Sequence, residues 1–402
     1  MNCRPLTFSL SCILFLASCS NPESSNPNQY LKEVLLNLDE IKSATFYSRG
    51  EAWSPGDTVP SFVHYSYFKT YDNPADTTLG VKWVTLDSAD TTQLRFAYDG
   101  KMRASVYEDK QGIMIDSFNV RKLPFRPVSV PFYNYTQDII EYILNTKDSI
   151  TLDLDDLKDS IYVKLTIYEE QKVEFFGQAY HMPEPPYGYT DPTSRYELWI
   201  NKSTNLPYKY RREMDHNISV NSVFNSRFNS VELEDIVAAS YFPGGYEIRQ
   251  YGKKRKVASP HELLGKKAPD WLLTDEHKEK ISLNELKSKV VLVQFTSVNC
   301  GPCRASISFL NKLASEYSEE DFDLVAVESY TSNTNVLSSY RKRTGLDYKL
   351  LMSEKEVNSN YNIQATPIFF ILDQNRIIQE VFGGYSGDST DEAITEAINK
   401  LI

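Results

Sequence analysis

Two cysteines near the start of the last third of the chain have the spacing of a redox pair. Cys300 and Cys303 are separated only by Gly301 and Pro302. On a helix this spacing places the second sulfur about one turn beyond the first, close enough to attack a mixed disulfide formed at Cys300. Because the thiolate is the reactive form of cysteine, the pair predicts thiol-disulfide exchange. Cys300 would be the nucleophile and Cys303 the resolving cysteine.

The elements around this pair are those needed to lower the pKa of the Cys300 thiol. Residues 290–295 form a continuous apolar run, which is typical of a buried central strand, and the dithiol follows directly. The residues beyond it have an apolar face at helical spacing: Ile307, Leu310, Ala314 and Tyr317. At the start of such a helix, the Cys300 sulfur would meet unpaired backbone N–H groups and the positive end of the helix dipole. Arg304 would add a positive charge, and Pro302 is harmless in a first turn.

The N-terminus has the features of an export signal. Arg4 supplies a positive charge, residues 6–16 are largely apolar, and the segment ends in Leu-Ala-Ser-Cys at Cys19. Such a stretch is too short and too early for a mature transmembrane span. The small residues before Cys19 resemble the bacterial lipobox, in which signal peptidase cuts before a cysteine that carries lipid. An ordinary secretory signal or a retained anchor is the alternative.

We therefore expect a lipoprotein signal peptide over residues 1–18, lipidation at Cys19, and a polar tether over residues 19–29. This predicts a protein of the bacterial cell envelope, lipid-anchored to a membrane on its periplasmic side. The net charge of −11, without a long basic run, argues against a nucleic-acid partner.

The other cysteines limit what the pair can do. Cys3 and Cys12 would leave with the signal peptide, and Cys19 would carry lipid, so only the dithiol remains. A Cys-x-x-Cys pair can also be half of a zinc site or an inert structural pair. Zinc would need two further ligands, and His261 and His277 are isolated. We expect no metal and no cofactor.

With 402 residues, the chain is long enough for about two domains. Residues 30–252 read as a mainly antiparallel sheet of eight to ten strands with one or two helices. The opening helix has an apolar face of Leu31, Val34, Leu35, Leu38 and Ile41. Strand patterns recur around Val63, at 94–98, at 163–167 and from Tyr196 onward, and the proline-rich stretch 180–193 predicts a surface loop.

Residues 196–207, Tyr-Glu-Leu-Trp-Ile-Asn-Lys-Ser-Thr-Asn-Leu-Pro, resemble a hairpin of lipoprotein-carrier domains of the LolA and LppX type. The resemblance implies an unclosed, curved half-barrel whose apolar concave face could hold an acyl chain or a lipoprotein. A second hypothesis follows from it. The protein would be a lipid- or lipoprotein-binding carrier, and the dithiol would only sense redox state.

The second domain follows a basic linker. Residues 253–263 begin with Lys-Lys-Arg-Lys, which favours a solvated connection over a docking patch. Residues 264–402 then alternate strand and helix: strands at 290–295, 322–327, 367–372 and 377–381, and helices after the dithiol, at 335–344 and at 391–402. This order predicts an α/β fold.

The segment 264–402 resembles thioredoxin-like disulfide reductases of the TlpA and ResA type, within the broader group that includes peroxiredoxins. The matching pieces are Gly-Lys-Lys-Ala-Pro-Asp-Trp at 265–271 with Asp275, the strand at 290–295, the Cys-Gly-Pro-Cys, and Ala365-Thr366-Pro367. The resemblance implies a thioredoxin fold in which Pro367 follows a cis peptide bond beside the dithiol. It makes Thr366 and Pro367 substrate-positioning residues. It also implies a reducing enzyme that acts on disulfide-bearing envelope proteins and is recharged by a membrane electron donor.

Several positions depart from the family pattern. Gln294 stands where thioredoxin has a buried acid, and Ser306 where ResA-type proteins have a glutamate. Asn299 replaces the usual tryptophan, and Ser308 replaces a helix-kinking proline. The proton acceptor for Cys303 is therefore unassigned. Glu328 is one candidate, although a solvated carboxylate at a strand end is the simpler interpretation.

A thiol peroxidase is a further alternative. Peroxiredoxins carry a threonine three residues before their reactive cysteine, whereas Thr296 lies four before Cys300. The Gly-Pro between the two cysteines would then be unexplained, so we expect exchange rather than peroxide reduction.

Overall fold

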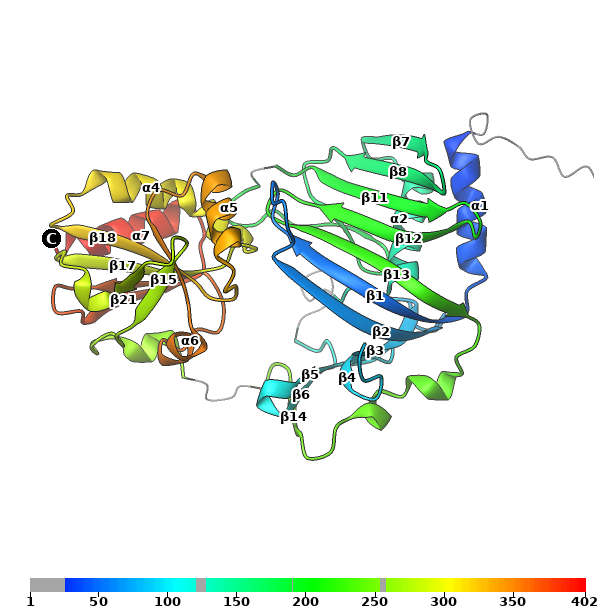
Figure 1. Ribbon diagram of the computed structural model, residues 1–402, viewed down its shortest axis with the longest axis horizontal. Helices are drawn as coiled ribbons and strands as arrows, with labels where there is room; N and C mark the ends of the chain where they lie inside the picture. Colours follow the sequence, from blue (N-terminus) through cyan, green and yellow to red (C-terminus); the bar gives the residue numbers. More distant parts are fainter. Residues whose placement is uncertain (1–25, 121–127, 190, 254–257) are drawn as a thin grey trace, which may run out of the picture.

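The computed structural model describes residues 26–120, 128–189, 191–253 and 258–402. It contains a large β-sheet domain and a smaller α/β domain, which lie side by side (Figure 1). The predicted signal peptide and Cys19 lie outside the described residues. Within the described ranges, the helices are too short or too polar to cross a membrane.

The N-terminal domain is organised around one twelve-stranded sheet. Its order is β14-β6-β5-β4-β3-β2-β1-β13-β12-β11-β8-β7. All neighbours are antiparallel except β14 and β6, which are parallel. The strands are β1 (Ser43–Trp53), β2 (Phe62–Asp72), β3 (Val81–Asp87), β4 (Leu94–Tyr98), β5 (Arg103–Tyr107), β6 (Gly112–Asp116), β7 (Ile150–Asp156), β8 (Ser160–Ile167), β11 (Ser194–Asn201), β12 (Leu206–Glu213), β13 (Ile218–Phe228) and β14 (Glu247–Gln250).

The expected antiparallel domain is confirmed, but eight to ten strands were too few. Besides the large sheet, β9 (Val173–Phe175) pairs with β10 (Ala179–His181). Short strands such as these carry too few residues for an alternating pattern to stand out in the sequence.

Two helices cover one face of the large sheet. α1 (Pro27–Asp39) and α2 (Phe132–Asn145) pack together, and Ile139 and Ile140 of α2 are fully buried against the sheet. α1 begins at Pro27, with Asn26 as its cap, so the tether predicted to run to residue 29 ends earlier. The sheet remains open, since β7 and β14 are its edges (Figure 1).

The C-terminal domain has the predicted α/β thioredoxin fold. Its seven-stranded sheet has the order β16-β15-β19-β18-β17-β20-β21. The strands are β15 (Leu272–Asp275), β16 (Lys280–Ser282), β17 (Val290–Thr296), β18 (Phe322–Glu328), β19 (Lys349–Met352), β20 (Ile368–Leu372) and β21 (Ile378–Gly383). The helices are α3 (Gly301–Ala305), α4 (Ile307–Glu316), α5 (Thr334–Thr344), α6 (Lys355–Asn360) and α7 (Asp388–Asn399).

β17 lies at the centre of this sheet and is buried on both faces. Val290 and Leu292 pack in one apolar cluster with side chains of α4, α5 and α7. Val291, Val293 and Phe295 pack in a second cluster on the other face, which includes Tyr361. This two-sided burial explains why the strand is a continuous apolar run rather than an alternating one.

Short 3-10 turns complete the chain. Pro260–Leu263 forms one of them within the segment predicted as a linker. In the N-terminal domain, Leu233–Ile236 and Ala238–Tyr241 lie over the other face of the large sheet, where they cover Val84 and Leu86.

Candidate functional site

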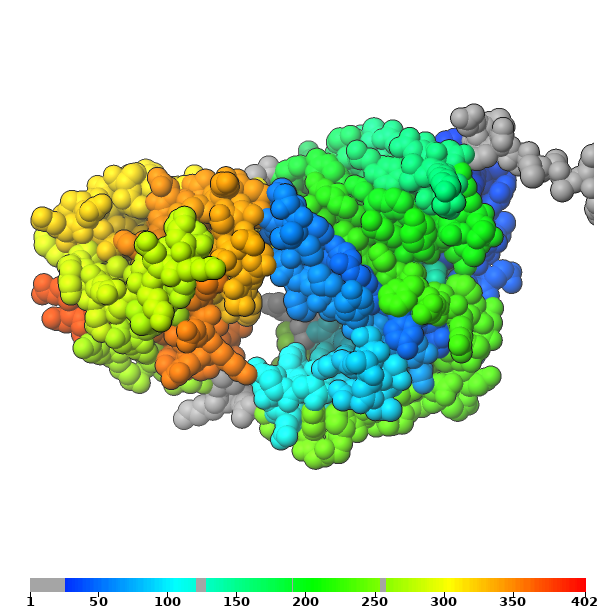
Figure 2. Space-filling model, viewed as in Figure 1, coloured from blue at the N-terminus to red at the C-terminus, as the bar shows by residue number. Residues whose placement is uncertain are grey.

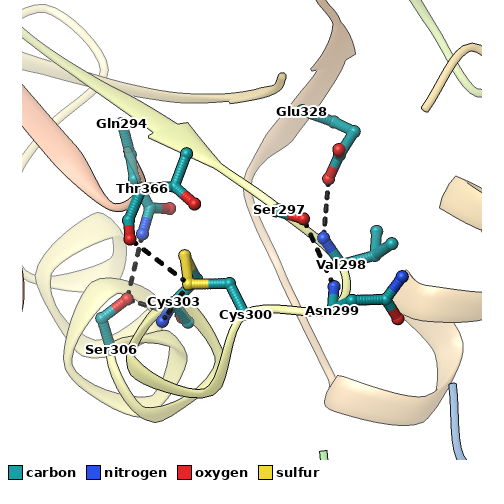
Figure 3. The surroundings of a disulfide bond; sticks show 9 residues. All are labelled: Gln294, Ser297, Val298, Asn299, Cys300, Cys303, Ser306, Glu328 and Thr366. Carbon is teal, nitrogen blue, oxygen red and sulfur yellow. Dashed lines mark hydrogen bonds between the residues drawn. A yellow bond between two sulfur atoms is a disulfide. The ribbon is translucent and has the colours of Figure 1, made fainter. Parts of the chain in front are cut away.

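The dithiol lies where β17 gives way to α3. Three loop residues follow Thr296, and Cys300 is the N-cap of α3. Cys300 and Cys303 are joined in a disulfide, with their Cα atoms 5.2 Å apart (Figure 3). Cys303 is fully buried, whereas Cys300 is partly exposed. Only Cys300 can therefore meet a substrate sulfur directly.

The Cys300 sulfur has a backbone partner that would favour a thiolate. The N–H of Cys303 points at Cys300 Sγ over 3.2 Å. Such a bond favours the charged form of the acceptor. Arg304, predicted to add positive charge, instead extends across the domain boundary and donates to the backbone carbonyl of Asp215.

Thr366 and Pro367 lie beside the dithiol. The Thr366-Pro367 peptide bond is cis, and the carbonyl oxygen of Thr366 is 3.6 Å from Cys300 Sγ (Figure 3). Pro367 directly precedes β20, which pairs with β17. The chain thus brings these two residues to the sulfur, as their expected positioning role requires.

A polar pair lies in the interior next to Cys303. Gln294 Nε2 donates to Ser306 Oγ over 3.0 Å, and Ser306 Oγ donates to the Cys303 carbonyl over 2.8 Å. A serine that bonds back to a carbonyl in the preceding turn bends a helix. This explains why α3 and α4 are separated at Ser306 although Ser308 is not proline. Because neither an amide nor a hydroxyl is a base at neutral pH, neither Gln294 nor Ser306 is the proton acceptor for Cys303.

Glu328 corrects one expectation from the sequence. It is fully buried rather than solvated at the end of β18. Burial raises the pKa of its carboxyl group to about 7, although backbone hydrogen bonds from Tyr330, Thr331 and Val298 work in the opposite direction. The bond from the Val298 N–H is 2.7 Å long (Figure 3).

The role of Glu328 is therefore to hold the loop before Cys300. Its hydrogen bonds join Val298, in the loop after β17, to Tyr330 and Thr331, after β18. One signal of this was present in the sequence. An acid that ends an apolar strand parallel to β17 lies at the same edge of the sheet as the dithiol.

The N-terminal domain contributes to the surroundings of the dithiol, which sequence reasoning missed. Ser54 Oγ donates to Asn299 Oδ1 over 3.1 Å, and Asn299 Nδ2 donates to Ser61 Oγ over 3.4 Å. On the other side, a Cβ atom on Gly301 would lie 3.1 Å from the hydroxyl oxygen of Tyr187. No local pattern could have indicated these contacts, since the partners are more than a hundred residues apart.

A cluster of charged and polar residues of the N-terminal domain lies beside Gly301 and Arg304. Asp215 accepts hydrogen bonds from Lys172 and from His216 Nδ1, the latter over 2.8 Å. Burial alone would raise the pKa of Asp215, but the hydrogen bonds from His216 and Lys172 and the charge of Lys172 lower it to about 2. These residues line a cavity of about 200 Å³ between the two domains.

One group in the described part of the chain has metal-ligand chemistry. Asp148, Glu169 and His181 bring one ligand atom each to within 4.8 Å of one another, on the surface of the N-terminal domain. Asp148 is engaged by Tyr142 and His181, and Glu169 accepts from the Ser149 N–H. Hydrogen bonding thus accounts for the arrangement.

Comparison with known proteins identifies the C-terminal domain. The redoxin family matches residues 263–398. Thioredoxin-like protein YneN of Bacillus subtilis (strain 168) is 30% identical over 142 residues, which cover 35% of this chain and 81% of that protein. The chain belongs to the redoxin family of thioredoxin-like proteins. Its C-terminal domain is called the redoxin domain below.

Two further proteins are similar to the redoxin domain. Thiol-disulfide oxidoreductase ResA of Bacillus thuringiensis subsp. konkukian (strain 97-27) is 26% identical over 140 residues, 34% of this chain and 78% of that protein. A solved structure of a putative thiol:disulfide interchange protein DsbE from Chlorobium tepidum has 23% identity and a TM-score of 0.32, and covers 34% of this chain and 96% of its own. The similarity to ResA confirms the expected relationship to thiol-disulfide oxidoreductases.

Proposed function

We propose that this protein is a lipid-anchored thiol-disulfide oxidoreductase of the bacterial cell envelope that reduces protein disulfides on the periplasmic side. The burial of Cys303 behind a partly exposed Cys300 is the observation that carries the exchange chemistry, and the sequence that ends in Cys19 supports the anchor. Two sulfurs with such unequal access favour a fixed order of attack.

The reaction consists of two successive thiol-disulfide exchanges. The Cys300 thiolate attacks a substrate disulfide, so that a mixed disulfide forms and one substrate sulfur leaves as a thiolate. Cys303, once deprotonated, attacks Cys300 Sγ and releases the second substrate thiolate. The substrate has then gained two electrons, and the Cys300–Cys303 disulfide of Figure 3 has formed. A membrane electron donor would reduce this disulfide again.

Thr366 supports the proposal as a substrate-positioning residue. Its carbonyl oxygen lies beside Cys300 Sγ, so a substrate backbone that hydrogen-bonds to it would bring its own sulfur to the nucleophile. Pro367 joins Thr366 to β20, which pairs with β17.

Cysteine variants test the chemistry. The reduced wild-type protein should reduce insulin, whereas Cys300→Ser should be inactive. Cys303→Ser should accumulate mixed disulfides through Cys300, which mass spectrometry of trapped complexes would identify. A wild-type protein that neither reduces disulfides nor forms mixed ones would refute the proposal. The equilibrium of the wild-type dithiol with glutathione gives its redox potential, and this shows whether the protein reduces or oxidises its substrates.

The anchor needs its own test. Expressed in a bacterial host, the wild-type protein should partition into the detergent phase, and Cys19→Ser should move it to the aqueous phase. Equal partitioning of the two proteins would refute lipidation at Cys19.

The carrier hypothesis gains less support. The sheet face that could hold an acyl chain is packed by α1 and α2, with Ile139, Ile140 and Leu31 fully buried. An acyl chain would have to displace a helix to enter.

A further inference from the structure

The reactive sulfur is flanked on one side by the turn between β1 and β2. This turn carries Ser54 and Ser61, which share the side chain of Asn299 between them. Ser54 is buried. A hydrogen-bonded contact of the N-terminal domain therefore occupies the surface next to Cys300 on its N-terminal side.

A second contact covers the other side of Cys300. Tyr187 packs against the apolar cluster of the redoxin domain, with its hydroxyl group next to Gly301. The backbone of Pro186 and Tyr187 also approaches Gly387 at the start of α7. Together with the bond from Arg304 to Asp215, this contact occupies the surface on the helix side of the sulfur.

A buried ion pair braces the two domains at a distance from the sulfurs. Asp57, in the turn between β1 and β2, pairs with Arg343 near the end of α5. The Asp57 side chain is only 2% exposed and that of Arg343 17% exposed. Removing one member leaves the other charge buried without its partner in this arrangement of the domains, which destabilises that arrangement. The pair thus favours the closed arrangement of the domains.

The boundary between the two domains is not closed everywhere. A groove of about 1140 Å³ runs between the edge of the large sheet and the end of α6. Its walls include Ile115 and Ile248 on the sheet side and Ile363 and Gln364 on the redoxin side. Gln364 and Ala365 are exposed and Thr366 is partly exposed, so an accessible stretch of chain joins the groove to the substrate-positioning segment. Figure 2 shows an opening between the domains in this region.

The groove suits an extended polypeptide. β14 is the outermost strand of its sheet, and exposed Ile248 lies on it within the groove. An extended segment can lie along such an edge and still offer its backbone to Thr366. A folded protein has no such freedom, because it would need the surface around Cys300, where Asn299 and Gly301 already contact the N-terminal domain.

We propose that the N-terminal domain acts as a shape filter, so that the enzyme reduces disulfides on extended, flexible polypeptide segments and rejects those on folded surfaces. This inference rests on the proposed reductase function, and it assigns the substrate class of the same dithiol. The exchange steps are unchanged; the filter decides which sulfurs reach Cys300.

The test uses one carrier protein with a single cysteine, placed either on a helix surface or in a flexible C-terminal tail. Each form carries glutathione as a mixed disulfide, and its release by the reduced enzyme is measured. Every rate is divided by the rate with dithiothreitol, which corrects for intrinsic reactivity. Two enzyme variants, Arg343→Ala and Asp57→Asn, remove the ion pair between the domains. The control variant Arg95→Ala removes the surface ion pair with Asp87 inside the N-terminal domain.

The wild type should prefer the tail substrate by about tenfold or more, as a domain-opening cost of about 1.4 kcal/mol would give. Arg343→Ala and Asp57→Asn should reduce this preference at least threefold by speeding the helix-surface substrate, while Arg95→Ala keeps it. An unchanged tail rate shows that the variants are folded. The proposed filter would be overturned if the wild-type enzyme had no preference, or if Arg343→Ala and Asp57→Asn kept the wild-type preference. Failure of the wild type on both substrates would instead contradict the proposed reductase function.

Discussion

The buried carboxyl group of Glu328 should make the stability of the redoxin domain depend on pH. The carboxyl group has a pKa of about 7 in the folded chain, against 4.5 in its ordinary state, because burial disfavours its charged form. Between these values the folded state keeps a proton that the unfolded state releases. Raising the pH therefore favours unfolding. The stabilisation is complete below about pH 4.5 and is lost as the pH rises through 7.

The size of this effect follows from the shift. A change from 4.5 to about 7 corresponds to about 3 kcal/mol of unfolding free energy. Glu328→Gln cannot ionise, so the slope should disappear in this variant. The variant should also be less stable at low pH by about 1–3 kcal/mol. The two carboxyl oxygens of Glu328 accept hydrogen bonds from the backbone N–H groups of Val298, Tyr330 and Thr331, and the amide of glutamine has only one oxygen that can accept.

Proteins with more than one domain commonly unfold in more than one step, so the assay must report on the redoxin domain alone. We suggest urea unfolding between pH 5 and 8, followed by a brief deuterium pulse at one fixed pH and mass spectrometry of peptides from β17 and β18. The exposed acid Glu380, on β21, provides a control: Glu380→Gln should keep the wild-type slope. If wild type and Glu328→Gln lose stability equally as the pH rises, the reasoning about burial is wrong.

Two further changes test the interior near the dithiol. Ser306→Ala should destabilise the redoxin domain by about 1–3 kcal/mol because it leaves the buried Gln294 amide without its acceptor, whereas Gln294→Leu combined with Ser306→Ala should recover most of the loss. Urea midpoints for the single and double variants decide this, and equal destabilisation in both would contradict it. Arg376→Met should cost about 3 kcal/mol, since the buried guanidinium donates to the carbonyls of Leu286, Ser288 and Asp373. A midpoint within error of the wild type would contradict that assignment.

Local sequence patterns determined the redoxin domain. The apolar run at 290–295, the Cys-Gly-Pro-Cys and Thr366-Pro367 sufficed to predict the central strand, the dithiol at the start of a helix and the fold around them. These features are local because each depends on the periodicity or spacing of a few neighbouring residues. In the N-terminal domain, the opening helix, the antiparallel class and several strands could be predicted this way.

Tertiary structure decided what surrounds the sulfurs. Glu328 is buried because β18 ends beside the loop after β17, and its own residue type gave no sign of that. Asn299 and Gly301 meet Ser54 and Tyr187 only because two separate domains pack together. Contacts between residues so far apart depend on the shapes of both domains, which no local pattern contains. The sequence thus indicated the pair of sulfurs, and the packing of the domains decided what surrounds them.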